Sequence, residues 1–281
     1  MNAGKNVRPS PIAGRWYPGD EKELARKVDT YIAGAKLPEI EGSIIAIMSP
    51  HAGYLYSGPV AGYAFAAVKG FKPDLVVVVS PMHHPYTYPL LTTLHDAFVT
   101  PLGEIPVDTG AVKTLSEQLE RVYGTHLTAV AQDPEHSLEI ELPFLQRALD
   151  GGFHLLPVMV RDQSIPVMEA LGTALAEVLK GKNTLLVAST DLSHFYPQKI
   201  ALKYDYEFLR RVETFDPQSV INAEEEGVGF ACGRGAVAAV MWASKILGAN
   251  KIQILNHATS GDIIGKYDEV VGYGAAVMTR T

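Results

Sequence analysis

Histidine occurs in three short polar segments that each follow an apolar run of the sequence. These segments are residues 49–51 (SPH), 80–84 (SPMHH) and 189–194 (STDLSH). Neutral imidazole is the commonest metal ligand in proteins, and it is also the side chain that moves protons near neutral pH. One such histidine, taken alone, is typical of a hydrogen-bonded structural group. Three segments in equivalent positions predict a shared site for a metal ion, for proton transfer, or for both.

Cys232, the only cysteine of the chain, is either a candidate ligand or a small buried group. It lies just before a predicted helix over 233–247, where free N–H groups and the helix dipole would stabilise a thiolate and favour metal binding. A lone cysteine is also typical of a packed interior. Because one cysteine forms neither an internal disulfide nor a CxxC metal motif, any role it has depends on residues of other types.

Two further segments are rich in polar side chains. Segment 135–144 (EHSLEIELPF) carries His136 and Glu139 three residues apart, which on a helix places them on one face without the H-E-x-x-H spacing of zinc enzymes. Segment 256–262 (NHATSGD) contains short hydrogen-bonding groups that either line a pocket or form a turn. Taken alone, it indicates a turn.

Alternating helices and strands are predicted to position these segments. Residues 43–49 and 74–81 are continuous β-branched runs, typical of strands covered on both faces, and the helical pattern between them predicts a parallel β-α-β unit. Further strands are expected at 153–160, 183–190, 251–258 and 270–279, and a small antiparallel excursion at 89–108. Helices are expected at 21–34 (capped by Asp20), 109–122, 135–149, 165–180, 198–214, 216–225 and 233–247.

The predicted fold class is α/β, with a mixed, largely parallel central sheet flanked by helices on both faces, in one domain spanning 1–281. Open parallel sheets carry their sites at the carboxyl ends of the strands, which is where the histidine segments fall.

Composition excludes several classes of partner. The chain has 281 residues, a net charge of −7, 47% hydrophobic and 20% charged residues, which is typical of a soluble globular protein. Lysine and arginine form no basic stripe along the sequence, so we expect no nucleic-acid partner. No apolar run approaches the roughly 20 residues that span a bilayer, and the first residues lack the apolar core of a secretory signal. We therefore expect a cytoplasmic protein with no membrane association.

Seven motifs, in their order along the chain, resemble the Memo-like family, also called the AmmeMemoRadiSam system protein B family. They span nearly the whole sequence: AGRWYPG (13–19), PHAGYLYSG (50–58), SPMHH (80–84), EHSLEIELPF (135–144), STDLSH (189–194), CGRG (232–235) and TSGD (259–262). That family is similar to the class III extradiol ring-cleaving dioxygenases, such as protocatechuate 4,5-dioxygenase, which hold non-haem Fe(II) with two histidines and a glutamate. The resemblance implies a dioxygenase-like fold.

The resemblance also implies site residues. It places the metal ligands at three positions: His51, His83 and Cys232. It makes His194 the candidate acid/base, with Asp191 orienting the proton and His136 contributing. Fe(II) is the implied ion, and because a sulfur ligand replaces the carboxylate of the dioxygenases, copper and zinc are compatible as well.

Two functions remain open. The first is a metal-dependent redox enzyme that activates oxygen or acts on a small, aromatic or otherwise oxidisable substrate. The second is a binding protein or adaptor that holds a peptide or a metal without turnover, working with an Ammecr-type protein and a radical-SAM enzyme, as the family name implies. A hydrolase is the least supported class, because Ser193 is adjacent to His194 in sequence and no G-x-S-x-G elbow is present.

Overall fold

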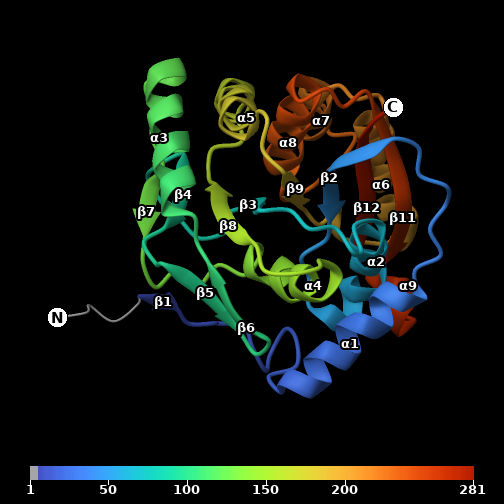
Figure 1. The fold of residues 1–281 in the computed structure, drawn as a ribbon. Coiled ribbons are helices and arrows are strands. Elements are labelled where there is room, and N and C mark those ends of the chain that lie inside the picture. The colour runs from blue at the N-terminus through green and yellow to red at the C-terminus, as the bar shows by residue number, and fades with distance from the viewer. Residues whose placement is uncertain (1–5) are drawn as a thin grey trace.

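The computed structural model describes residues 6–281, so the first five residues of the domain predicted over 1–281 lie outside it. These residues form a nine-stranded mixed sheet with helices on both faces, and a three-stranded sheet beside it (Figure 1). The predicted α/β class is confirmed. The strands of the large sheet follow one another in the order β10 (His194–Tyr196), β12 (Val270–Arg280), β2 (Ser43–Ser49), β9 (Thr184–Ser189), β3 (Leu75–Pro81), β8 (His154–Val160), β4 (Leu90–Thr93) and β7 (Thr128–Val130). The ninth strand, β11 (Lys251–Thr259), lies outside this order and pairs with β12.

The small sheet and the helices complete the described chain. The small sheet consists of β1 (Val7–Arg8), β5 (Ala97–Thr100) and β6 (Gly103–Pro106). The helices are α1 (Glu21–Gly34), α2 (Tyr54–Ala67), α3 (Thr109–Tyr123), the 3-10 helix η1 (Glu139–Glu141), α4 (Leu142–Ala148), α5 (Ile165–Leu179), α6 (Gln198–Glu213), α7 (Pro217–Glu225), α8 (Arg234–Ile246) and α9 (Ser260–Ile264). No helix within residues 6–281 combines the length and the apolar character needed to cross a membrane.

Parallel pairing is concentrated in the middle of the large sheet. Strands β2, β9, β3 and β8 run parallel, whereas β12 and β4 pair with β2 and β8 in the antiparallel direction. The two strands of the predicted β-α-β unit, β2 and β3, are parallel but not neighbours, because β9 lies between them. Ser49 of β2 is the register partner of Ser189 of β9. Three adjacent strands therefore end at one edge of the sheet, and each continues into one of the histidine segments.

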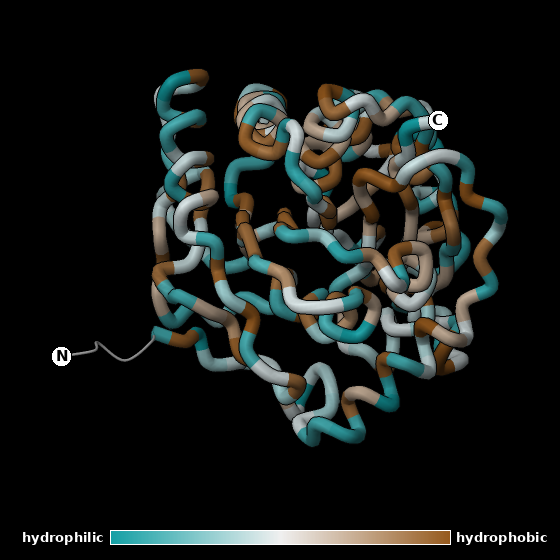
Figure 2. Tube along the Cα trace, viewed as in Figure 1, coloured by the Kyte–Doolittle hydropathy of each residue, from teal (hydrophilic) through white to brown (hydrophobic). Residues whose placement is uncertain are grey.

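Two hydrophobic cores cover the two faces of this sheet. Along β3, Val77 and Val79 belong to one core, and Val76 and Val78 belong to the other. Because alternate residues of a strand point to opposite faces, a strand buried on both faces must be apolar at every position. Helices α5, α7 and α8 cover one face and α1, α2 and α4 the other (Figure 1). In Figure 2 the central strands are largely hydrophobic, whereas α1 and α3 alternate between hydrophobic and hydrophilic residues.

The helix predicted over 135–149 begins later than expected. Helical structure starts at Glu139, because the backbone N–H groups of His136 and Ser137 donate to the Glu135 carboxylate at 2.9 Å and so leave the first turn as a loop. Pro143 lies in the first turn of α4, where its missing N–H costs no helical hydrogen bond. The segment that carries His136 is therefore fixed by a side chain and not by helix geometry.

The predicted cap at Asp20 is present, whereas the turn predicted over 256–262 is not. Asp20 caps α1 as expected, since its side chain accepts the N–H of Glu23 at 2.9 Å. The turn expected over 256–262 is instead the end of β11 followed by the short helix α9, whose Thr259 and Asp262 form a capping box.

Candidate metal centre

Three imidazoles converge at the carboxyl ends of the parallel strands. His51 follows β2, His83 follows β3, and His136 lies in the loop before η1. One ligand nitrogen of each ring lies within 4.8 Å of those of the other two. The ring centroids of His83 and His136 are 4.8 Å apart, and that of His51 is 5.4 and 5.5 Å from them. Such a cluster can hold a metal ion.

The Nδ1 atom of each ring faces an acceptor. His83 Nδ1 lies 2.9 Å from Glu135 Oε1, His136 Nδ1 lies 3.2 Å from the same oxygen, and His51 Nδ1 lies 2.9 Å from Ser189 Oγ. An acceptor at Nδ1 favours the tautomer in which Nδ1 carries the proton and Nε2 carries the free lone pair. These contacts favour a free lone pair on Nε2 of His51 and His83, and the nearby Glu135 oxygen favours the same tautomer for His136.

Glu135 is the charged partner of two of these rings. Its carboxylate accepts the backbone N–H of His83 at 2.6 Å and those of His136 and Ser137 at 2.9 Å. Burial raises the pKa of Glu135, but the hydrogen bond and charge of His83, the charge of His136 and the backbone donors outweigh it and hold that pKa well below its usual range. A buried negative charge therefore lies beside the cluster, where it would balance part of a cation's charge.

Burial also keeps two of these imidazoles, His51 and His136, neutral. It lowers the pKa of His51 well below the ordinary value, with His136 and His83 contributing in the same direction. It lowers the pKa of His136 to about 4, although the nearby Glu135 carboxylate opposes the change. Only the neutral ring binds a metal, so these two side chains need no deprotonation at neutral pH.

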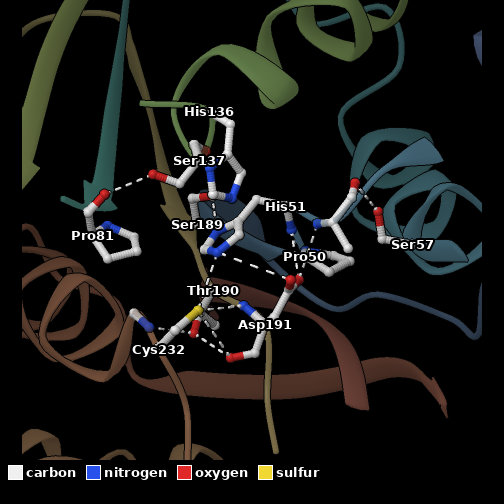
Figure 3. A network of polar contacts seen from close by, with 12 residues as sticks. Pro50, His51, Ser57, Pro81, His136, Ser137, Ser189, Thr190, Asp191 and Cys232 are labelled. Atoms are coloured by element: carbon white, nitrogen blue, oxygen red, sulfur yellow. Dashed lines mark hydrogen bonds and ion pairs between the residues drawn. The ribbon is translucent and has the colours of Figure 1, made fainter. Parts of the chain in front are cut away.

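Cys232 lies at the edge of the cluster, next to His51. Its Sγ is 3.1 Å from His51 Nε2, and the Asp191 N–H donates to it at 3.3 Å (Figure 3). As predicted, it precedes the helix α8, for which Gly233 is the N-cap. Burial nevertheless raises the pKa of the thiol, and the Asp191 charge adds to this, so the helix end does not by itself produce a thiolate. The sulfur lies outside the set of three converging nitrogens, and its role as a ligand stays a prediction.

Asp191 and His194 form part of the same region but do not bond to each other. Asp191 Oδ1 accepts the backbone N–H groups of His51 and Ala52 at 2.8 and 3.3 Å, and burial raises its pKa to about 7. His194 Nδ1 lies 2.7 Å from the Leu192 carbonyl oxygen, and burial lowers its pKa. His194 is thus an imidazole whose Nδ1 is engaged by the backbone, and its acid/base role stays a prediction, whereas Asp191 fixes the backbone at His51.

A cavity of about 450 Å³ adjoins the cluster. Its walls include Trp16, Tyr56, Phe195 and Tyr273. The Trp16 ring packs on His136 with centroids 4.1 Å apart, so the histidines lie next to this wall, although none of the three lines the cavity itself. Cavities of this size hold small organic molecules in many proteins.

Glu135 and Ser189, which contact the histidine rings, are functional residues that the sequence pattern does not reveal. Glu135 precedes His136 directly, and Ser189 is the last residue of its strand, so their positions were visible as polar groups at strand and loop ends. Nothing in their spacing shows which ring each one contacts, because those contacts join segments about 50 to 140 residues apart.

Together, the fold and the cluster define an α/β protein with a three-histidine centre at the carboxyl edge of its parallel strands. Residues 8–277 match the family model of the Memo-like proteins, and the chain belongs to this family. It is 35% identical to a MEMO1 family protein of Nitrosopumilus maritimus over 274 residues, which cover 96% of this chain and 98% of the relative. It is 37% identical to a MEMO1 family protein of Thermotoga neapolitana over 287 residues, 97% of this chain and 100% of the relative.

A solved structure shares the fold. The crystal structure of an uncharacterized protein from Escherichia coli K12 superposes with a TM-score of 0.55 at 16% identity, covering 84% of this chain and 100% of that one. At this identity the similarity concerns the fold alone.

Proposed function

We propose that the protein binds a divalent transition-metal ion at His51, His83 and His136, with the Cys232 thiol beside His51, and that it is a redox enzyme. The observation that carries the proposal is the convergence of three imidazole nitrogens within 4.8 Å, with hydrogen-bond partners at Nδ1 of His51 and His83 and the Glu135 carboxylate 3.2 Å from Nδ1 of His136. Histidines outside the cluster differ in this respect, because His95 and His257 each contact a separate partner, Asn6 and Asp205, and within the described part of the chain do not converge with other histidines.

The donor set fits a transition-metal ion. Neutral imidazoles suit iron, copper, nickel and zinc, and an adjacent soft sulfur extends the range towards copper(I) and zinc. We take Fe(II) as the resident ion, with copper or zinc as the alternatives. When bound, iron supplies one-electron chemistry and oxygen activation that side chains lack. Three protein nitrogens leave coordination positions for a substrate, and Glu135 supplies a compensating charge.

The substrate is proposed to be a small, oxidisable, aromatic molecule in the adjoining cavity. Its aromatic walls favour stacking with a flat ring, and one of those walls, Trp16, packs on His136 of the cluster. His194 takes up or returns a proton at Nε2, since its Nδ1 is engaged by Leu192 O. General acid–base assistance is worth about 10²–10⁴-fold in rate. His194→Asn should therefore slow turnover while leaving the bound metal unchanged.

The proposal is tested by purification without oxygen, elemental analysis, and oxygen uptake with catechols and aminophenols. The expected result is one metal ion per chain and oxygen consumption by the loaded protein. His136→Asn should abolish metal binding, whereas His126→Asn, at a side chain 59% exposed and outside the cluster, serves as the matched control. Wild-type protein that neither retains nor takes up a transition metal would contradict the proposal.

The third ligand is tested separately. Cys232→Ser should weaken metal binding less than His136→Asn, because the sulfur lies outside the converging set. The reverse order of effects would support the set His51, His83 and Cys232 implied by the family resemblance.

A binding protein or adaptor is the second candidate, favoured by the exposed apolar side chains at the cavity. Phe195 is 69% exposed and Ile264 43% exposed, and both line the cavity. Exposed apolar groups around a pocket are typical of peptide or protein docking. Metal binding without oxygen consumption would favour this function, and partner binding should then survive substitution of the histidines. An Ammecr-type protein and a radical-SAM enzyme are the partners to test first.

A further inference from the structure

Glu141 is a fully buried carboxyl group, and none of the residues 6–281 places a cation beside it. Its residue is 1% exposed, and it lies at the end of η1 behind the metal-binding edge of the sheet. Oε2 has no hydrogen-bond partner among residues 6–281, whereas Oε1 lies 2.7 Å from Ser189 Oγ. A charged carboxylate is costly in such a place unless it is paired, so a buried, unpaired carboxyl group tends to keep its proton.

The contacts of the Ser189 hydroxyl are all satisfied when Glu141 carries a proton. Its hydroxyl lies 2.9 Å from His51 Nδ1, 2.7 Å from the Ser137 carbonyl oxygen and 2.7 Å from Glu141 Oε1. A hydroxyl has one proton to donate and two lone pairs that accept. The Ser137 carbonyl only accepts, so it takes the hydroxyl proton. For Nε2 of His51 to bind an ion, Nδ1 must carry the proton and donate it to one lone pair of Ser189 Oγ. The second lone pair of Ser189 Oγ then faces Glu141 Oε1, which can donate only if the carboxyl group is protonated.

We propose that Glu141 is held as a neutral carboxylic acid that donates to Ser189 and thereby fixes His51 in the tautomer that presents Nε2 to a metal ion. Glu141 is thus a positioning residue that acts through Ser189. The part that concerns the ion rests on the proposed function, and the protonation state stands by itself.

The charges around Glu141 support retention of the proton. Burial raises its pKa to about 8, the Asp191 carboxylate acts in the same direction, and the hydroxyls of Ser189 and Ser49 only partly oppose them. The Tyr54 phenol also lies near Glu141, and burial raises its pKa, so it stays neutral. Glu135 has the opposite arrangement, with several donors around one carboxylate.

Difference infrared spectroscopy tests the protonation state directly. The spectrum of the metal-free wild-type protein minus that of Glu141→Gln, at neutral pH, should contain the C=O stretching band of a protonated carboxylic acid. The corresponding difference for Glu135→Gln should contain carboxylate bands only. Carboxylate bands in the Glu141 difference would overturn the proposal.

Metal affinity tests the action through Ser189, with Zn²⁺ as the probe in calorimetric titrations. Glu141→Gln should bind Zn²⁺ close to the wild-type level, because its amide N–H donates in place of the acid. Glu141→Leu and Ser189→Ala should bind about 10–100-fold more weakly, as when other partners of ligand histidines are removed. Equal losses in Glu141→Gln and Glu141→Leu, in variants that unfold cooperatively, would refute the positioning role. Failure of the wild type to bind Zn²⁺ or other transition metals would contradict the proposed function, while the infrared result would still decide the proton on Glu141.

Discussion

Arg8→Met should destabilise the protein by removing the one cation that residues 6–281 place in a buried set of acidic side chains. The Arg8 guanidinium, 2% exposed, donates to both oxygens of Asp133, to the Glu135 carbonyl oxygen and to Glu139 Oε2. Removing one member of a buried ion pair costs about 3–5 kcal/mol, because the other charge is left unpaired. With an unfolding entropy of about 0.6 kcal/mol/K for a chain of this length, the melting temperature should fall by about 5–8 °C.

A matched control separates burial from the loss of an arginine. Arg147 also forms a two-fold hydrogen-bonded pair, with Asp29, but these side chains are 40% and 47% exposed. Exposed pairs contribute about 0–1 kcal/mol, so Arg147→Met should lower the melting temperature by less than about 2 °C. Thermal unfolding followed by circular dichroism measures both changes. Similar shifts in the two variants would refute the reasoning, as would an Arg8→Met protein that melts like the wild type.

Other changes test the surroundings of the histidines. Glu135→Gln removes the negative charge next to the His83 and His136 rings, so the Zn²⁺ affinity measured by calorimetry should fall about 10–100-fold. Gly233→Ala would place a Cβ 2.3 Å from the Ser189 carbonyl oxygen and should lower the melting temperature, whereas Gly34→Ala meets open space and should not. The pKa of His136 is lowered to about 4 in the folded protein, so on acidification the unfolded chain takes up a proton at this ring before the folded chain does. The free energy of unfolding of metal-free protein should therefore be at its full value above about pH 6.5 and should fall by up to about 3 kcal/mol as the pH drops to 4. Chemical denaturation measures this loss, and His136→Asn should remove it.

The strand ends were the part of the site that the sequence could predict. Continuous β-branched runs at 43–49, 74–81 and 183–190 indicate strands buried on both faces, and parallel strands bring their carboxyl ends to one edge. This reasoning correctly brings the segments of His51 and His83 together. It could not place β9 between β2 and β3, because strand order depends on long-range packing and leaves no local pattern.

The place of His136 could not be predicted for a different reason. Its helical spacing to Glu139 suggested a helix, whereas the Glu135 side chain competes with the backbone and holds the residue in a loop. That loop turns the ring towards His51 and makes His136 a member of the converging set. The place of Cys232 before a helix was predicted, but desolvation, which raises the pKa of its thiol, cannot be judged without the surrounding structure.

An anomalous-scattering map from crystals grown anaerobically with Fe(II) tests the three-histidine centre most directly. The account predicts one strong peak about 2.0–2.2 Å from a nitrogen of each of His51, His83 and His136, the distance typical of metal–imidazole bonds. Crystals in which the three rings are ordered and no peak lies between them, or in which the ion binds elsewhere on the chain, would contradict it.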